Sequence, residues 1–488
     1  MMRSLFSGVS GLKVHQTKMD VIGNNISNVN TVGFKASTVT FSDILYQTTQ
    51  SASGPNETTG AAGKNAMQIG LGASIAGITT NASVSGGSQR TDNPFDVMIN
   101  GDGFFVVKSG GTNYFTKAGA FQVDAAGTLC TSSGAVVMGW LPNEEQTGID
   151  VGTVEELQIM SPDNLTAEPE ATTEAKITGN IDKNDEQLVS TDGKPVQIKF
   201  YDNLGNTYTA QFSIKQSATN TSQYSVDLTD IVDKDNNSIF LVESTNASTG
   251  VVTTALNANL AGVTLGGITY TASYSAGELT FTHSSSNTLS FNPGTGEFAS
   301  VGGTTATSAD KKLALAINAG SGAGAAAAVA PFDAFNIDFS TITMYAASGT
   351  CSLEGSKGDL TGAGTGRKAG EMTGISIDAA GKIYGSYSNG TDRILGQIAL
   401  ATFANPSGLE AVGNNMFAET QNSGEFDGIG VDPSSQGNSL TTGVLEMSNV
   451  DLSQEFTTMI TTQRGFQANS RIITTSDTML EELINLKR

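Results

Sequence analysis

Few residues of this chain have the types and spacing that catalysis or metal binding needs. The two histidines, His15 and His283, stand near no Ser/Asp or Cys arrangement typical of a catalytic base. The two cysteines, Cys130 and Cys351, are far apart, and their spacing predicts neither a zinc site nor a disulfide framework. We expect two buried free thiols, with a single bridge between them as the alternative. No catalytic residue is predicted.

Three further stretches resemble binding motifs only superficially. The glycine-rich stretch 362–367 fits neither the Walker nor the dinucleotide spacing, so a plain loop is expected. The stretch 100–103 (NGDG) lacks the long acidic loop of a calcium site, and a hairpin turn is predicted instead. The carboxylate pair Glu144-Glu145 lies in a polar stretch and is expected to be solvated. We therefore expect no enzyme, no cofactor and no metal ion.

The composition excludes other classes of function. A chain of 488 residues is too long for one core, so roughly two to four domains are expected. Hydrophobic residues make up only 38%, and 57 glycines help to fill the deficit, which is typical of turn-rich secreted β domains. The net charge of −22 argues against a nucleic-acid surface and against anionic membranes. No membrane helix is expected, and the broken apolar N-terminus predicts no cleaved signal peptide.

Both ends of the chain carry an apolar stripe with helical spacing. Residues 452–488 predict one long helix, and residues 1–30 predict a weaker one whose glycines each cost about 1 kcal/mol. A helix this weak needs a partner. We expect the two helices to pair as a coiled coil and to bind helices of other copies in a polymer. The predicted polymerisation residues are Leu5, Val9, Leu12, Met19, Ile26, Leu452, Phe456, Met459, Phe466, Ile473, Leu480 and Ile484.

The middle of the chain alternates with the period of β-strands. The tetrapeptide Asp-Ala-Ala-Gly occurs at 124–127 and again at 378–381, each time between short apolar strands, which predicts one β domain that the chain enters twice. Alternation over 196–214 and 268–281 predicts antiparallel hairpins in an inserted domain. The Ala/Gly-rich stretch 320–330 is expected to be a loop.

The predicted fold class is α+β and mainly β. The N- and C-terminal helices form a coiled-coil inner domain, and antiparallel β-sandwich or barrel-like outer domains are inserted between them. The expected domains are 1–34 with 440–488 (terminal helices), 35–90 (linker), 91–150 with 345–439 (discontinuous inner β domain) and 171–344 (outer inserted β domain).

Asparagine-rich strings near both ends carry a family resemblance. At 20–31 (DVIGNNISNVNT) and 33–35 (GFK), the chain resembles the N-terminal signature of the bacterial flagellar rod/hook axial family. At 445–452 (LEMSNVDL), it resembles that family's C-terminal signature. Its length, the segment 375–405 and the ending 483–488 are most similar to the family's hook proteins. The signature residues are Asn24, Asn25, Asn28, Asn30, Gly33, Phe34, Ser448, Asn449, Val450, Gln463 and Arg464.

The resemblance implies a structural subunit rather than an enzyme. Hook proteins are exported through the flagellar type III apparatus without a cleaved signal, and they polymerise under a cap into a curved tube. This tube, outside the cell in the basal body–hook complex, is a universal joint that passes motor torque from rod to filament. The implied partners are other copies of the chain, the distal rod protein, the hook cap, the hook–filament junction proteins and the export apparatus. Neither nucleic acid nor membrane insertion is implied.

Two alternatives stay open at this stage. The first is a distal rod protein or another axial component of the flagellum, against which the length and the β insertion count. The second is a secreted β-rich adhesin that uses the insertion over 171–340, although an adhesin would not need striped termini. The stretch 46–67 is long for a compact hook protein and lies within the expected linker.

Overall fold

The computed structural model describes residues 2–55, 60, 62–143, 148–245, 252–257, 259–302, 311–319, 332–347, 349–435 and 437–486. The chain divides into two compact units. The first unit comprises Met1–Leu165, Thr373–Ser386 and Asp392–Arg488, and the second comprises Thr166–Met372 and Tyr387–Thr391. In sequence, the second unit is thus an insertion into the first. The finer four-part division expected from the sequence stays a prediction.

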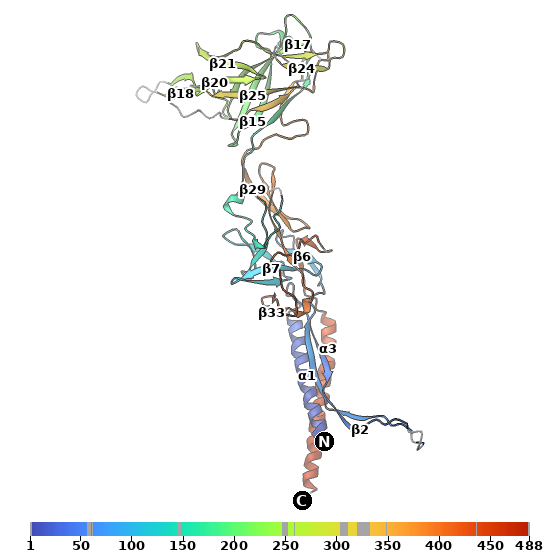
Figure 1. Ribbon diagram of the computed structural model, residues 1–488. Helices are drawn as coiled ribbons and strands as arrows, with labels where there is room; N and C mark the ends of the chain where they lie inside the picture. Colours follow the sequence, from blue (N-terminus) through green and yellow to red (C-terminus); the bar gives the residue numbers. More distant parts are fainter. Residues whose placement is uncertain are drawn as a thin grey trace. The chain divides into compact units, whose positions relative to one another are not determined.

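Two long helices of the first unit run side by side (Figure 1), as the terminal stripes predict. These are α1 (Met2–Ser27) and α3 (Leu452–Asn485). The carboxylate of Asp451 accepts hydrogen bonds from the N–H groups of Ser453 and Gln454, which caps the start of α3. At its other end, α3 extends past the start of α1 (Figure 1).

The first unit also contains short strands, a four-residue helix α2 (Pro162–Leu165) and the 3₁₀ helix η2 (Pro406–Gly408). The strands are β1 (Ser37–Asp43), β2 (Tyr46–Gln50), β3 (Met67–Gly70), β4 (Ala73–Thr80), β5 (Ser88–Arg90), β6 (Val97–Asn100), β7 (Phe104–Ser109), β8 (Thr112–Thr116), β9 (Phe121–Val123), β10 (Leu129–Thr131), β11 (Val136–Trp140), β12 (Glu155–Glu156), β29 (Gly370–Ile377), β30 (Lys382–Tyr387), β31 (Asp392–Ile398), β32 (Leu400–Ala401), β33 (Glu410–Gly413), β34 (Met416–Ala418), β35 (Ser439–Thr442) and β36 (Val444–Glu446).

An antiparallel sheet with the order β30-β31-β11-β7-β8-β34-β33 forms the β part of this unit. Its core is aromatic, with Phe104, Phe115 and Phe417 buried together. Both Asp-Ala-Ala-Gly turns close as predicted. The carboxylates of Asp124 and Asp378 each accept backbone N–H groups two and four residues on, which fixes two hairpins of the same design.

The stretch 100–103 is not the hairpin turn that its sequence predicts. Strands β6 and β7 form on either side of it, but β6 pairs with β35 and β7 pairs with β8 and β11. The backbone bends sharply at Gly101, where φ is +132°. The sequence around 100–103 cannot predict this pairing, because β35, the partner of β6, lies more than three hundred residues further along the chain.

The expected linker over 35–90 is instead largely β structure. Strand β1 pairs with β4, and β2 pairs with β3, both antiparallel. Serine and threonine hydroxyls pair across β1 and β4, as between Thr38 and Thr79 at 3.2 Å. Positions in β1 alternate only between half-buried and exposed, and every residue of β2 and β3 is exposed, so these three strands have no buried face. The sequence therefore lacks the periodic signal that normally predicts a strand.

The second unit is a β structure with the 3₁₀ helix η1 (Glu186–Val189). Its strands are β13 (Thr166–Ala167), β14 (Glu174–Asn180), β15 (Lys194–Tyr201), β16 (Thr207–Gln216), β17 (Gln223–Val232), β18 (Leu241–Thr245), β19 (Val252–Leu256), β20 (Leu260–Leu265), β21 (Ile268–Ser275), β22 (Glu278–Thr282), β23 (Asn287–Phe291), β24 (Phe298–Gly302), β25 (Lys312–Ala319), β26 (Phe335–Asp338), β27 (Ile342–Thr343) and β28 (Glu354–Lys357).

Two sheets of the second unit share one core. Their orders are β22-β21-β20-β25-β26-β14-β27 and β15-β16-β17-β23-β24. Phe200 of one sheet lies 4.7 Å from Phe335 of the other, between ring centroids. The predicted hairpins β15–β16 and β21–β22 are confirmed. The sheets are not wholly antiparallel, because β14 pairs in parallel with β26 and β27.

The predicted fold class, mainly β with paired terminal helices, is therefore confirmed. Cys130 and Cys351 are both free and buried. The stretch 362–367 is a loop whose turn is closed by the Asp359 carboxylate, which accepts the N–H groups of Thr361 and Ala363. The pair 144–145 and the stretch 320–330 lie outside the described residues. Of the helices described, none has the length and apolarity needed to cross a membrane.

Candidate assembly surface on the paired terminal helices

Glycines let α1 and α3 approach closely. A Cβ atom at Gly8 would lie 3.2 Å from Cγ1 of Ile473, and one at Gly11 would lie 2.7 Å from the Asn469 side chain. On the other helix, a Cβ atom at Gly465 would lie 2.7 Å from the His15 ring. The glycines that weaken α1 as an isolated helix therefore make room for its partner.

The face of α1 that is buried within the chain is not the predicted stripe. Its buried residues are Gly8, Val14, Ile22 and Asn25, whereas Val9 is 50% exposed. Leu5, Leu12, Met19 and Ile26 are half-buried. The buried face combines the large apolar Val14 and Ile22, which lie outside the predicted stripe, with Gly8, whose small size allows the close contact.

On α3, the predicted stripe divides into two groups. Met459, Phe466, Ile473 and Leu480 are half-buried, with the buried Thr462 and Ser476 between them. Leu452, Phe456 and Ile484 are exposed. The exposed large apolar residues of both helices are Met2, Phe6, Val9, Leu452, Phe456, Ile460, Ile472, Met479, Leu483, Ile484 and Leu486. We call this set the helix apolar surface. So much apolar surface on one helix pair indicates a binding face.

The β1–β4 ribbon packs along α1 and contacts its one histidine. The rings of His15 and Phe41 meet edge to face at 5.9 Å, and Nζ of Lys18 lies 5.4 Å from the centre of the Phe41 ring. Nδ1 of His15 is buried without a hydrogen-bond partner in the described structure. Burial, and then the charge of Lys18, lower the pKa of His15. His15 is therefore a neutral packing residue at neutral pH.

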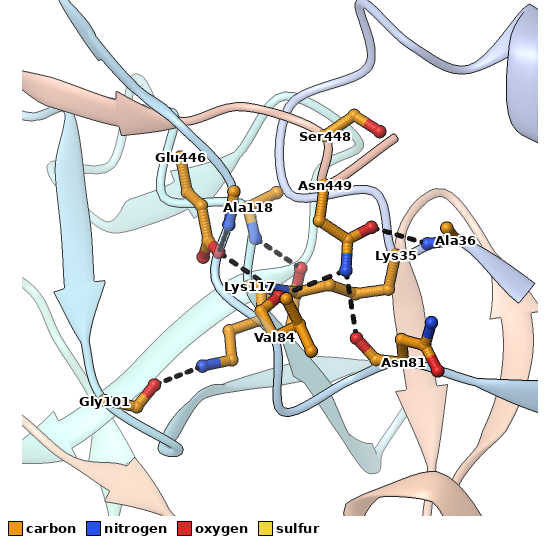
Figure 2. A network of polar contacts seen from close by, with 12 residues as sticks. Lys35, Ala36, Asn81, Val84, Gly101, Lys117, Ala118, Glu446, Ser448 and Asn449 are labelled. Atoms are coloured by element: carbon orange, nitrogen blue, oxygen red, sulfur yellow. Dashed lines mark hydrogen bonds and ion pairs between the residues drawn. The ribbon is translucent and has the colours of Figure 1, made fainter. Parts of the chain in front are cut away.

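A buried network, the neck, joins the helices to the β part of the first unit (Figure 2). Nζ of Lys35 lies 2.7 Å from Oε1 of Glu446, and both side chains are fully buried. Lys35 also donates to the carbonyl of Val84 at 2.7 Å, and the N–H of Gly86 donates to Glu446 at 2.9 Å. The ion pair thus connects the chain just after α1 with the chain shortly before α3.

Signature asparagines complete the neck with backbone hydrogen bonds. Oδ1 of Asn449 accepts the N–H of Ala36 at 2.7 Å, and its Nδ2 donates to the carbonyls of Asn81 and Val84 (Figure 2). Asn25, nearly fully buried, exchanges two hydrogen bonds with the backbone of Ser37. A side-chain amide both donates and accepts hydrogen bonds, so each asparagine can bind the backbone N–H and C=O groups of a neighbouring segment.

Asn25 also binds α3, because its Nδ2 donates to Oε1 of Glu455 at 3.0 Å. The remaining signature residues have smaller roles within the chain. Asn24 and Asn28 hydrogen-bond each other at the end of α1, and Asn30 is exposed. Phe34 and Val450 are half-buried, and Ser448 is buried. Gln463 and Arg464 are exposed on α3, so neither of them holds the neck together.

Three charged residues of the neck were not predicted from the sequence. Lys35 and Glu446 belong to the resembled strings but were assigned no role, and Lys117 was not singled out. Lys117 is 1% exposed, donates to the carbonyl of Gly101 at 2.7 Å and lies over the Phe104 ring. A sequence signal exists for Lys35 and Glu446, which stand within the resembled strings at 33–35 and 445–452. Lys117 lies outside both strings.

Lys117 makes the stability of the first unit depend on pH. Burial lowers its pKa from 10.5 to about 8; Lys35 acts in the same direction, whereas Glu446 and Asp102 oppose it. Between pH 8 and 10.5 the unfolded chain therefore holds a proton that the folded chain has released, so Lys117 makes the free energy of unfolding rise with pH. Replacing Lys117→Met removes this rise. Chemical unfolding across that pH range measures it.

The exposed Lys108 provides a matched control for this prediction. The Lys108→Met variant should keep the wild-type pH dependence of stability. If the curves of the wild type and Lys117→Met ran parallel from pH 8 to 10.5, the assigned role of Lys117 would be wrong.

Gly33 gives a second prediction about the neck. Its φ is +70°, and a Cβ atom there would lie 2.7 Å from the backbone nitrogen of Ala118, which cannot move aside. We expect Gly33→Ala to lower the free energy of unfolding by at least about 2 kcal/mol. Gly23, within α1, has no neighbouring heavy atom within 4 Å of such a Cβ. Gly23→Ala should therefore raise the free energy of unfolding by about 1 kcal/mol. Urea midpoints of the two variants that moved in the same direction would contradict this account.

Among the described residues, no group of three or more His, Cys, Asp or Glu could hold a metal ion. His283 lies in the second unit, 3.9 Å from the Asp227 carboxylate and beside the Tyr270 ring. Exposed large apolar residues, by contrast, gather on the paired helices as the helix apolar surface.

Comparisons with known proteins agree with this picture. Three family models match the chain: "Flagella basal body rod protein" at residues 5–35, "Flagellar hook protein FlgE/F/G D1 domain" at 98–180 and "Flagellar basal body rod FlgEFG protein C-terminal" at 441–486. The chain is 35% identical to the flagellar hook proteins FlgE of Borreliella burgdorferi and Treponema pallidum, over 100% of each chain. It is 27% identical to the flagellar basal-body rod protein FlgG of Bacillus subtilis, again over 100% of each chain.

Proposed function

Because this chain belongs to the flagellar hook protein family and is a structural subunit of the bacterial flagellar hook, we propose that its copies polymerise through α1 and α3 into a curved, flexible tube. The tube is a universal joint that transmits torque from rod to filament. The observation that carries this proposal is the helix apolar surface, which one copy leaves open to solvent. Burying each such Leu, Ile, Met or Phe against a neighbour contributes about 1.5–3 kcal/mol before entropy.

The neck supports the mechanical part of the proposal. A subunit that carries torque must pass load from its helices to its β region without bending freely between them. Buried polar contacts join the segment after α1 to the segment before α3; they are made by Lys35, Glu446 and Asn449. Hydrogen bonds and ion pairs fix distances and angles more strictly than apolar packing does. We propose that the neck keeps the helix pair and the inner β region aligned while the polymer rotates.

The remaining functional proposals follow from the family. Residues 1–34 with 440–488 form the inner coiled-coil layer, 91–150 with 345–439 the inner β domain, and 171–344 the outer domain. The partners, besides other copies of the chain, are the distal rod protein, the hook cap, the hook–filament junction proteins and the type III export apparatus. Export occurs without a cleaved signal peptide, and the hook lies outside the cell.

Immunogold electron microscopy of intact flagella tests the proposal. An antibody raised against residues 172–340 should place gold only on the short curved segment between the cell surface and the filament. Gold spread over the cell surface would favour the adhesin instead. Absence of gold on flagella, with label appearing only on isolated basal bodies, would favour a rod component.

A further inference from the structure

The β2–β3 ribbon is a second exposed element, which we call the arm. Its register pairs Tyr46 with Gly70 and Gln47 with Ile69, and the N–H of Leu71 donates to the carbonyl of Leu45. Every residue of both strands is exposed. A two-stranded ribbon without a covered face is marginally stable in water. The arm therefore lacks a covering partner among the residues that the structure describes.

The two faces of the arm differ in chemistry. Residues opposite each other, or two apart on one strand, share a face, so the polar Gln47 lies on the same face as three apolar residues. These are Leu45, Met67 and Ile69. Their exposed fractions are 71%, 56% and 43%. On the opposite face, the Tyr46 ring covers Gly70, and Thr48 and Gln68 are polar. The arm thus has one apolar face that nothing in the described chain covers.

The base of the arm lies beside the start of α1, which carries part of the helix apolar surface. At the base of the arm, the N–H of Ile44 donates to the carbonyl of Gly72, and a Cβ atom at Gly72 would lie 3.4 Å from Cα of Ser7. The preceding residue of α1, Phe6, is 67% exposed. A neighbour that buries one of these surfaces is therefore positioned to reach the other.

The end of α3 carries a second exposed apolar site. An open groove of about 310 Å³ is lined by Thr478, Met479, Glu482, Leu483 and Leu486. Met479, Leu483 and Leu486 are 47%, 50% and 81% exposed. This part of α3 extends past the start of α1 (Figure 1), which explains why α1 does not cover it. The arm and the groove are both apolar and both open within a single copy.

We propose that the apolar face of the arm binds the α3-end groove of a second copy of this chain. The inference rests on the proposed polymerisation, because only a polymer holds many copies in a fixed relation. Each subunit then offers one arm and one groove, so the contact is head-to-tail and repeats along the assembly. The contact between arm and groove would hold neighbouring copies together in addition to the contacts between their helices.

Disulfide crosslinking within the assembled polymer tests this inference. The double variant Ile69→Cys/Leu483→Cys places one thiol on the apolar face and one in the groove. The native thiols are poor competitors, because burial raises the pKa of Cys130 and raises that of Cys351 to about 11. Under mild oxidation, the polymer should yield a ladder of dimers, trimers and higher multimers on a denaturing gel.

The matched control moves the first thiol to the opposite face, as Gln68→Cys/Leu483→Cys. Its ladder should be at least about tenfold weaker, because cysteines whose Cβ atoms are more than about 4.5 Å apart rarely bridge. Equal ladders from both variants, or none from polymers that form normally, would overturn the inference. So would a dimer from Ile69→Cys alone, which indicates pairing between arms.

A second pair of variants covers the case in which the cysteine variant fails to assemble. Ile69→Glu should raise the concentration needed for polymerisation, whereas Gln68→Glu should leave it at the wild-type value. Equal effects of the two charges would contradict the inference. If the wild-type chain itself formed no polymer, the proposed function would fail instead, and this outcome is distinguishable from failure of the arm contact alone.

Discussion

Replacing Glu446→Ala is expected to lower the free energy of unfolding of the first unit by about 3–5 kcal/mol, because the change leaves a buried lysine charge without its partner. Lys35 would keep only the carbonyl of Val84, and the N–H of Gly86 would lose its acceptor. Both long helices belong to this unit, so far-UV circular dichroism of the helical signal during urea unfolding reports the loss.

Two further variants test whether the loss of stability comes from the buried ion pair of the neck or from removing any charge. Arg90 and Asp92 form an ion pair at 2.6 Å whose side chains are 82% and 73% exposed, so Asp92→Asn should leave the unfolding midpoint unchanged. The double variant Lys35→Met/Glu446→Leu should be more stable than Glu446→Ala, because it leaves no unpaired charge. A Glu446→Ala variant as stable as the wild type would show that the neck does not hold the unit together.

Replacing Phe456→Asp or Phe6→Asp is expected to prevent polymerisation while sparing the folded chain. The two side chains are 50% and 67% exposed, so neither is needed for the fold of a single copy. Both lie near the start of a helix, where a carboxylate is favourable. In the polymer each change loses about 1.5–3 kcal/mol of burial and adds the cost of a buried charge. The critical concentration should rise on the order of 100-fold or more.

Gln454→Asp provides the control for charge on the same turn of α3. Two residues along a helix correspond to roughly 200° of rotation, so this side chain points away from Phe456. It should polymerise as the wild type does in a sedimentation assay. Ile473→Asp would be a less selective test, because Ile473 already contacts α1 at Gly8 within one copy. Assembly of Phe456→Asp at wild-type concentrations would remove this residue from the proposed interface.

Local chemistry explains which elements the sequence could predict. The start of α3 follows from Asp451, and the turns at Asp124, Asp202 and Asp378 follow from carboxylates that accept nearby N–H groups. In each case the signal lies within a few residues of the feature. The terminal helices are predictable for the same reason, because their periodicity repeats along one segment.

Features that depend on distant segments could not be predicted. The pairing of β6 with β35 and the contact of Lys35 with Glu446 join residues more than three hundred positions apart. The buried face of α1 was missed for another reason, since it combines Val14 and Ile22 with Gly8, and a glycine gives no signal in a search for large apolar residues. The β1–β4 ribbon has no buried residue in one copy, so it lacks the apolar signal that normally predicts a strand.

The central claim is that the helix apolar surface becomes buried between copies. A cryo-electron microscopy reconstruction of the polymer measures this directly. We predict that Phe6, Phe456 and Leu483 each lose more than half of their present exposed surface to neighbouring copies. A polymer in which these side chains stayed exposed, with subunits joined only through their β regions, would contradict the account.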